Sequence, residues 1–369
     1  MTDWAYAADE EWLLAEPKGS RGKRMTETQL YETVEQWFSG FQIDTEALIA
    51  ALWEGDFFEA FQLLGTAALG LLGNPVTLVR SVLFSFLLLG IGGAVLKILD
   101  ETMRDGHVKL IGGWIIRLMT AAQLLTLFYE AMSMCRELLN TIVTFGNFFV
   151  PVFSVTLATV SGTGTSAGYI ALLSLIIYIT ERVLLKLLLP LVEVHFLLVI
   201  MAGFWQKERL ERILKLLEKV LSLVCKGILG AVTGMGFLQS LLLPYADALK
   251  IGAVQKAAEM IPGVGAISGT AWDFITGSAV LLKNTIGVLG VLALALTAAW
   301  PLFRLLVLQL ALKLSAALMG LMGAGELCFS VDQGGVSVEY LLKLAGLAVV
   351  LFLVWVVLAV CTTNQRMMF

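Results

Sequence analysis

Charged residues are scarce in this chain. Only 15% of its 369 residues are Asp, Glu, Lys or Arg, whereas about 25% is usual for soluble domains. Hydrophobic residues make up 58%, and the mean hydropathy is +0.86. A single soluble core stops growing near about 250–300 residues, so a soluble domain could not bury this much apolar surface. The composition argues against a soluble enzyme, a disordered chain and a disulfide scaffold, and it predicts a surface that faces lipid.

Residues that bind metals and nucleotides are also few. The chain has two histidines and four widely spaced cysteines, with no CxxC or Cys/His pattern typical of zinc sites. No Walker A pattern is present, so we expect no nucleotide hydrolysis by this chain. Neither half has the basic density of a nucleic-acid-binding protein. We therefore expect no cofactor, no metal, no catalytic residues and no nucleic-acid partner.

The charges divide the chain into two parts. Residues 1–64 carry 13 acidic and 4 basic side chains, whereas residues 65–369 carry 16 acidic and 21 basic ones. We predict an acidic polar N-terminal head with amphipathic helices over 1–64 and a polytopic transmembrane domain over 65–369. In the head, Thr26–Gln29 fits a capping box. The apolar face formed by Phe57, Phe58, Phe61 and Leu64 is suited to a membrane surface.

Long runs with few or no charges predict the membrane spans. A span takes about 20 mostly apolar residues. The runs lie at 78–98, 110–134, 138–180, 227–246, 284–303 and 344–365. The 43 uncharged residues of 138–180 suffice for two spans, with a turn or helix break at Ser161–Gly168. Residues up to Phe204 form either one long helix kinked at Pro190 or a span plus a half-span. We predict an all-α polytopic membrane protein with six to eight transmembrane helices, because helices satisfy their own backbone in lipid.

Residues 206–220 have the pattern of an amphipathic helix that lies on a membrane surface or on a partner. The apolar stripe begins at Leu210 and ends at Val220, and Glu211 and Lys215 form an i,i+4 pair. Arg209, Arg212 and Lys215 are the candidate contacts to an anionic surface or a partner. This basic segment fits the cytoplasmic side. The acidic, Gly-rich loop expected around Glu326 and Asp332 fits the outside, and the tail with Arg366 fits the inside.

A Gly-rich stretch is the candidate conduit or subunit interface. Pro262, Gly263, Gly265 and Gly269 interrupt an apolar run that also holds Asp273 and Lys283. Broken backbone is tolerated at membrane depth only where protein or water covers it. We predict a broken, re-entrant segment beside a path or between copies, with tight packing and no conduit as the alternative. Gly230 and Gly234 predict close helix contacts within the chain or between copies.

Two other groups of residues suggest chemistry within the membrane. Arg182, Lys186 and Glu193 fall within a narrow arc of a helix. They could line a polar path or bind a partner helix, or they could reach the interface as end-of-helix charges. The segment Gly164–Gly168 matches G-x-S-x-G, so an intramembrane serine protease using Ser166 and His195 is a further alternative. A flexible turn explains the same residues.

One part of the sequence resembles a known family. Six segments resemble the stage III sporulation protein AE family of endospore-forming bacteria. They are Ser278–Gly290, Ala298–Pro301, Leu312–Ala317 and Gly320–Gly325, with Ile261–Gly265 and Thr270–Thr276 upstream. The similarity covers roughly residues 45–369 and is most specific over 260–325. Members often begin with a signal-like apolar segment, which Met1–Arg24 does not show, so the orientation of the head stays open.

The resemblance implies a multi-pass component of the mother-cell membrane that faces the forespore. The implied partners are the other proteins of the same operon, including an ATPase and ring-forming single-span proteins, and forespore protein Q. We therefore expect a non-enzymatic, homo-oligomeric, permease-like core of a channel or secretion complex in the lipid bilayer. The alternatives are a non-conducting scaffold and a stand-alone transporter. The transporter is disfavoured because no inverted repeat is present.

Overall fold

The computed structural model describes Gln62 and residues 75–102, 106–161, 163–204, 207–259 and 265–364. Apart from one short turn, these residues are helical. Six helical stretches are long and apolar enough to cross a membrane, and they lie at Thr77–Leu96, Ile111–Asn147, Ala167–Phe204, Leu210–Leu238, Gly290–Leu321 and Leu327–Leu358. The prediction of an all-α polytopic protein is therefore confirmed. The amphipathic helices expected in the head lie outside the described residues.

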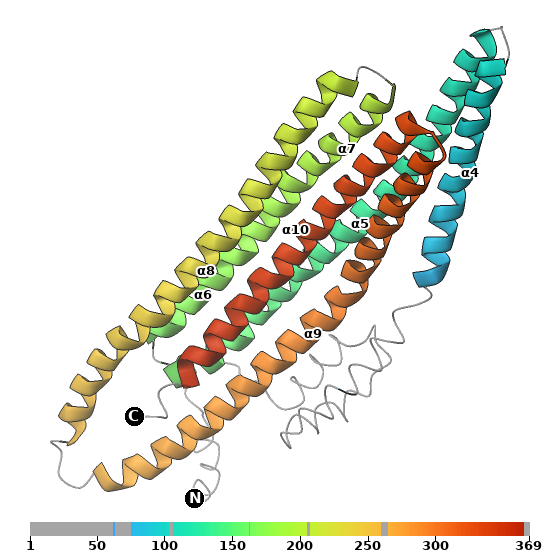
Figure 1. Cartoon of the computed structure of the whole chain (residues 1–369). Coiled ribbons are helices and arrows are strands. Elements are labelled where there is room, and N and C mark those ends of the chain that lie inside the picture. Colours follow the sequence, from blue (N-terminus) through green and yellow to red (C-terminus); the bar gives the residue numbers. More distant parts are fainter. Residues whose placement is uncertain are drawn as a thin grey trace, which may run out of the picture.

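The helices form a long, mostly antiparallel bundle (Figure 1). In chain order they are α4 (Pro75–Thr102), α5 (Gly106–Ser161), α6 (Thr163–Tyr178), the π-helix η1 (Ile179–Leu188), α7 (Leu189–Phe204), α8 (Lys207–Glu259), α9 (Gly265–Leu321) and α10 (Gly325–Asn364). Helix α10 lies at the centre, since 56% of its candidate span is buried, against 17–39% for the other five. Helix α4 packs beside α5 and α9 at one end of the bundle only.

Residues 163–204 form one continuous helical rod rather than a span and a half-span. The π-helical segment η1 lies in its middle. The Leu189 N–H donates to the Leu184 carbonyl five residues earlier, and Pro190 follows directly. Proline lacks an N–H and cannot continue the normal i→i−4 ladder, so a local widening of the helix accommodates it. The expected break near Ser161 is confirmed, because α5 ends there and α6 begins at Thr163.

Several predicted boundaries are wrong because no helix-breaking residue enforces them. Runs 110–134 and 138–160 belong to one helix, α5. The amphipathic segment 206–220 is not a separate surface helix but continues into run 227–246 within α8. Residues around Glu326 and Asp332 are not a loop but the first turns of α10.

The turn between α9 and α10 is shorter than expected and has a clear cause. Gly323 has φ of 82°. Its N–H donates to the Gly320 carbonyl (3.1 Å), and the Ala324 N–H donates to the Met319 carbonyl (3.2 Å). This pair of bonds is the Schellman motif, which ends a helix at a glycine in the left-handed region.

The expected broken segment at 261–269 lies partly outside the described residues. Helix α8 continues to Glu259 and α9 begins at Gly265, so only residues 260–264 separate two long helices. Gly265 and Gly269 therefore lie in regular helix. Pro262 and Gly263 lie outside the described residues.

Candidate functional site

His195 of α7 is fully buried in the bundle. Its Nδ1 lies 2.9 Å from Ser337 Oγ on α10. The Ser337 hydroxyl donates to the Gln333 carbonyl one turn earlier (3.2 Å). A serine hydroxyl has one proton to donate, so in the tautomer in which Ser337 bonds Gln333, Ser337 Oγ accepts from His195 Nδ1–H. This assignment leaves a lone pair on Nε2 of the neutral ring.

Glu218 of α8 faces that lone pair. Its Oε1 lies 3.5 Å from His195 Nε2, and Nε2 has no hydrogen-bond partner among the described residues. A lone pair and an ionised carboxylate repel each other. One proton, on the ring or on the carboxyl group, makes the contact attractive. In this tautomer the His195–Glu218 contact between α7 and α8 is therefore favourable when the pair carries one added proton.

Tyr340 of α10 links the same helices. Its hydroxyl donates to the backbone carbonyl of Glu218 (3.1 Å), and its ring packs against the His195 ring with centroids 5.9 Å apart. Lys343 Nζ lies 4.7 Å from the centre of the Tyr340 ring, in cation–π contact. We call His195, Glu218, Gln333, Ser337 and Tyr340 the polar cluster.

Ion pairs border the polar cluster. The Glu339 carboxylate accepts from Lys313 of α9 (2.8 Å) and from Lys343 of its own helix (2.7 Å). Arg304 of α9 pairs with Glu130 of α5. The side chains of these pairs are 26–47% exposed, and the pairs that cross between helices join α9 to α10 and α9 to α5. Ionisable groups inside an apolar bundle also mark functional positions more often than chance.

The predicted cluster of Arg182, Lys186 and Glu193 is only partly present. Lys186 Nζ lies 3.0 Å from Glu181 Oε1, and Arg182 Nε lies 3.9 Å from the same oxygen. The π-helix brings residues five apart onto one face, which explains the Glu181–Lys186 pair. Glu193 is exposed on α7 and makes no ion pair among the described residues. The group faces outward and does not join the polar cluster.

The basic side of the amphipathic segment also faces outward. Lys215 pairs with Glu211 at 2.7 Å, as its i,i+4 spacing predicts, and its side chain is 69% exposed. Arg212 is exposed, whereas the structure does not describe the side chain of Arg209. Only Leu214 of the predicted apolar stripe is fully buried; Ile213 and Val220 are exposed. These basic residues remain candidates for an external contact.

The candidate conduit residues lie away from the polar cluster. Asp273 and Lys283, like Gly265 and Gly269, lie on the first half of α9, and their side chains are outside the described part. Their predicted role is neither supported nor opposed. The contact prediction for Gly230 and Gly234 is wrong for the described part of the chain, where no atom lies within 4 Å of a Cβ placed at either position.

The proposed serine–histidine pair cannot form within one chain. Ser166 and His195 lie on the same continuous rod, α6–η1–α7, 29 residues apart. At about 1.5 Å per residue the two positions are roughly 40 Å apart along the rod. The G-x-S-x-G match therefore belongs to the first turns of a helix, and His195 bonds Ser337 instead.

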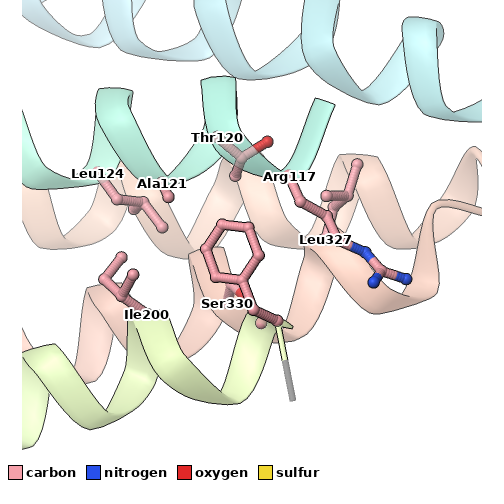
Figure 2. Close-up of a pocket in the computed structure, with 9 residues that line it drawn as sticks. Arg117, Thr120, Ala121, Leu124, Ile200, Leu327 and Ser330 are labelled. Atoms are coloured by element: carbon pink, nitrogen blue, oxygen red, sulfur yellow. The ribbon is translucent and has the colours of Figure 1, made fainter. Parts of the chain in front are cut away.

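A small cavity lies near the α9–α10 turn. Its volume is about 10 Å³, close to the space of one water molecule. Side chains of α5, α7 and α10 line it, among them Arg117, Thr120 and Ser330 (Figure 2). A space of this size cannot conduct a solute.

Sequence analysis missed Glu218, Ser337 and Tyr340. A usable signal was present: Gln333, Ser337 and Tyr340 follow the four-and-three spacing of one helix face inside an apolar run. That spacing shows a polar face on α10. It does not show that His195 and Glu218 meet this face, because they come from other helices.

Comparisons with known proteins identify the family of this chain. The sequence model of the family described as stage III sporulation protein AE matches residues 43–363. The chain is 24% identical over 289 residues to "Stage III sporulation protein AE" of Bacillus subtilis (strain 168), covering 78% of this chain and 72% of that relative. No solved structure matches. The match extends over most of the chain, including all five helices that carry the polar cluster and its ion pairs, and so the chain belongs to the stage III sporulation protein AE family.

Proposed function

We propose that this protein is the permease-like membrane core of a sporulation-specific channel or secretion complex that links the mother cell and the forespore. Family membership and six apolar helices support a multi-pass sporulation protein. The observation that carries the finer proposal is the contact between buried His195 and partly exposed Glu218, with the partly exposed ion pairs of Glu339 beside it. An inert anchor needs no ionisable side chain in its interior, whereas here the polar contacts of His195 and Glu339 join α7, α8, α9 and α10, and burying the His195 ring away from water has a cost.

The conduit in this proposal lies between subunits. The described bundle is closely packed around α10, and the cavity of Figure 2 holds about one water. Several copies, or one copy with ring-forming partners, would line the path. The ATPase of the same operon would supply energy, and this chain would do no covalent chemistry. The membrane is then that of the mother cell facing the forespore, with protein Q as the partner across the intermembrane space.

A non-conducting scaffold is the second candidate, favoured by the same close packing. It differs in one measurable respect. In a scaffold the complex needs this chain for assembly, whereas the passage of solutes does not depend on substitutions in this chain that leave the complex intact.

The test uses the assembled complex, purified from sporulating cells and reconstituted in liposomes. We expect efflux of a small fluorescent dye that falls when Glu218→Gln or Ser337→Ala is introduced, with the complex still intact on a sizing column. The matched control is Glu193→Gln, an exposed carboxylate on α7. Full efflux from intact complexes of both cluster variants would contradict the permease role. Intact complexes with no efflux from the wild type would favour the scaffold.

A further inference from the structure

Five helices each contain a segment without charged residues. The segments are 138–161 in α5, 163–180 in α6 and the start of η1, 227–246 in α8, 284–303 in α9 and 344–364 in α10. They contain between 18 and 24 residues. At about 1.5 Å per residue their lengths are about 27–36 Å, close to the roughly 30 Å hydrocarbon core of a bilayer.

Tertiary contacts bring the five segments to the same height. Phe149 of α5 contacts Trp355 of α10, with ring centroids 6.0 Å apart. The Trp355 indole N–H donates to the Tyr169 carbonyl of α6 (2.7 Å). A Cβ placed on Gly290 of α9 would lie 2.5 Å from Phe149, and one on Gly236 of α8 would lie 2.3 Å from Leu358 of α10. One uncharged layer therefore crosses all five helices.

Charges begin together at one edge of this layer. Charged residues directly precede or follow the segments at that edge. They are Arg136 and Glu137, Glu181 and Arg182, Lys226, Arg304 and Lys343. Beyond the edge lie the polar cluster and the ion pairs of Glu339 and Glu130. At the other edge the next charges along the sequence are Asp247, Lys283 and Arg366.

Helix α4 lies outside the layer although its composition suits a membrane span. A Cβ on Gly90 would meet Met319, and one on Gly93 would meet Leu327. Met319 is 29 residues from Gly290 on α9, and Leu327 is 28 residues from Trp355 on α10. Each separation is about 42–44 Å along a helix, well beyond half the bilayer thickness.

We propose that a single bilayer surrounds the charge-free layer, that five helices cross it, and that the charged half of the bundle, with α4 and the polar cluster, projects on the cytoplasmic side. If the bilayer instead surrounded the charged half of the bundle, the nine charged residues of α8 from Lys207 to Lys226 would lie in lipid. Each of them that cannot reach an interface would cost several kcal/mol.

The orientation follows from the basic residues. Among the described residues, the projecting side holds five Lys or Arg in 75–102 and 106–137, eight in 181–204 and 207–226, and three in 304–343. The other side holds three, in 247–259 and 265–283. Cytoplasmic segments carry the excess of Lys and Arg, and acidic residues contribute little.

This arrangement resolves a conflict between two predictions. The basic start of α8 and the acidic start of α10 lie at the same end of the bundle, because Gly203 near the end of α7 contacts Ser330. They cannot face opposite sides of the membrane. In the proposal the acidic start of α10 is cytoplasmic and the C-terminal end of α10 is outside, the reverse of what those two segments suggested alone.

The test compares single cysteines in a full-length background whose native cysteines are replaced by serine. Leu216 and Phe237 lie on α8, 62% and 59% exposed, on either side of the edge of the layer. Leu88 of α4 is 60% exposed. The probe is a membrane-impermeant maleimide, applied to intact protoplasts and to inverted membrane vesicles.

We expect Leu216→Cys and Leu88→Cys to react in inverted vesicles and not in intact protoplasts. Phe237→Cys should react in neither preparation until detergent is added, so of the three positions only this one should be protected by the bilayer. Labelling of Leu216→Cys in intact protoplasts would reverse the orientation. Labelling of Phe237→Cys, or protection of Leu88→Cys in both preparations with reactivity only in detergent, would overturn the five-crossing arrangement. None of these outcomes depends on whether the complex conducts.

Discussion

The two halves of the bundle are held together by different interactions. In the charge-free half, aromatic side chains and close approaches at glycine fill the space between helices, as with Phe149, Trp355 and Gly290. In the charged half, hydrogen bonds and ion pairs join the helices, as with His195–Ser337 and Lys313–Glu339. Lipid tails are as apolar as leucine, so helices in lipid associate mainly through close packing. Water beside the charged half permits polar contacts whose outer ends stay solvated.

Removing the central aromatic residue of the charge-free half should have the largest effect. Trp355→Ala deletes a side chain that is 1% exposed, its contacts with Phe149 and Phe352, and its bond to the Tyr169 carbonyl. We expect a loss of about 3–5 kcal/mol in unfolding free energy, from the cavity and the unpaired carbonyl. Titration with a denaturing detergent measures it. Val357→Ala, on the exposed side of α10, is the control and should change little.

Breaking the ion pairs of the charged half should rank second. Glu339→Gln removes the charge that Lys313 and Lys343 share. We expect a loss of about 2 kcal/mol, as for hydrogen bonds to charged groups, and a larger loss for Glu339→Leu. The double variant Lys313→Met, Glu339→Gln should lose less than the sum of the single variants. Strict additivity in the same titration would mean that the pair does not couple α9 to α10.

Overfilling the charge-free half tests its close packing. In Gly290→Ala the new methyl group would lie 2.5 Å from a Phe149 ring atom, so the ring must move. We expect a loss of about 1–3 kcal/mol. Gly230→Ala is the control, because its methyl group meets nothing within 4 Å. That variant should be neutral or more stable by up to about 1 kcal/mol, since alanine favours helix over glycine. Equal effects of both changes would contradict the packing described for α9.

Substituting two buried serines compares a hydrogen bond between helices with a hydrogen bond within one helix. Ser337→Ala leaves the His195 Nδ1–H without its acceptor, so we expect a loss of about 1–2 kcal/mol. Ser315→Ala removes only a bond to the Ala311 carbonyl of the same helix and should cost less. Thermal unfolding of the purified protein compares the two. If Ser315→Ala is the more harmful, the His195–Ser337 bond does not stabilise the charged half.

The smallest effect is expected at the boundary between the halves. Lys186→Met removes an exposed ion pair with Glu181, and exposed pairs contribute little because water screens them. We expect an unchanged unfolding midpoint, with Lys226→Met, at an exposed lysine of α8, as the control. A clear loss for Lys186→Met alone would indicate that the π-helical segment depends on this pair.

Much of the fold could be predicted from the sequence, and the candidate site could not. Uncharged runs predict the spans because transfer of charge into lipid is costly at every position of a run. Gly-rich stretches in the sequence indicated the break near Ser161 and the turn at Gly323 that follows α9. The prediction of a separate surface helix at 206–220 was wrong, because an amphipathic pattern shows which face of a helix is apolar and not where the helix ends.

By itself, the sequence determined that the chain is helical, that it lies in a membrane and to which family it belongs. These properties depend on local composition, on the spacing of neighbouring residues and on short motifs such as Ser278–Gly290. Only the tertiary structure decided which charges meet and at what height the charge-free segments align. His195 and Ser337 are 142 residues apart in the chain, and Tyr169 and Trp355 are 186 apart. Contacts over such separations are set by how long helices pack side by side, which depends on the shapes of all the side chains between them.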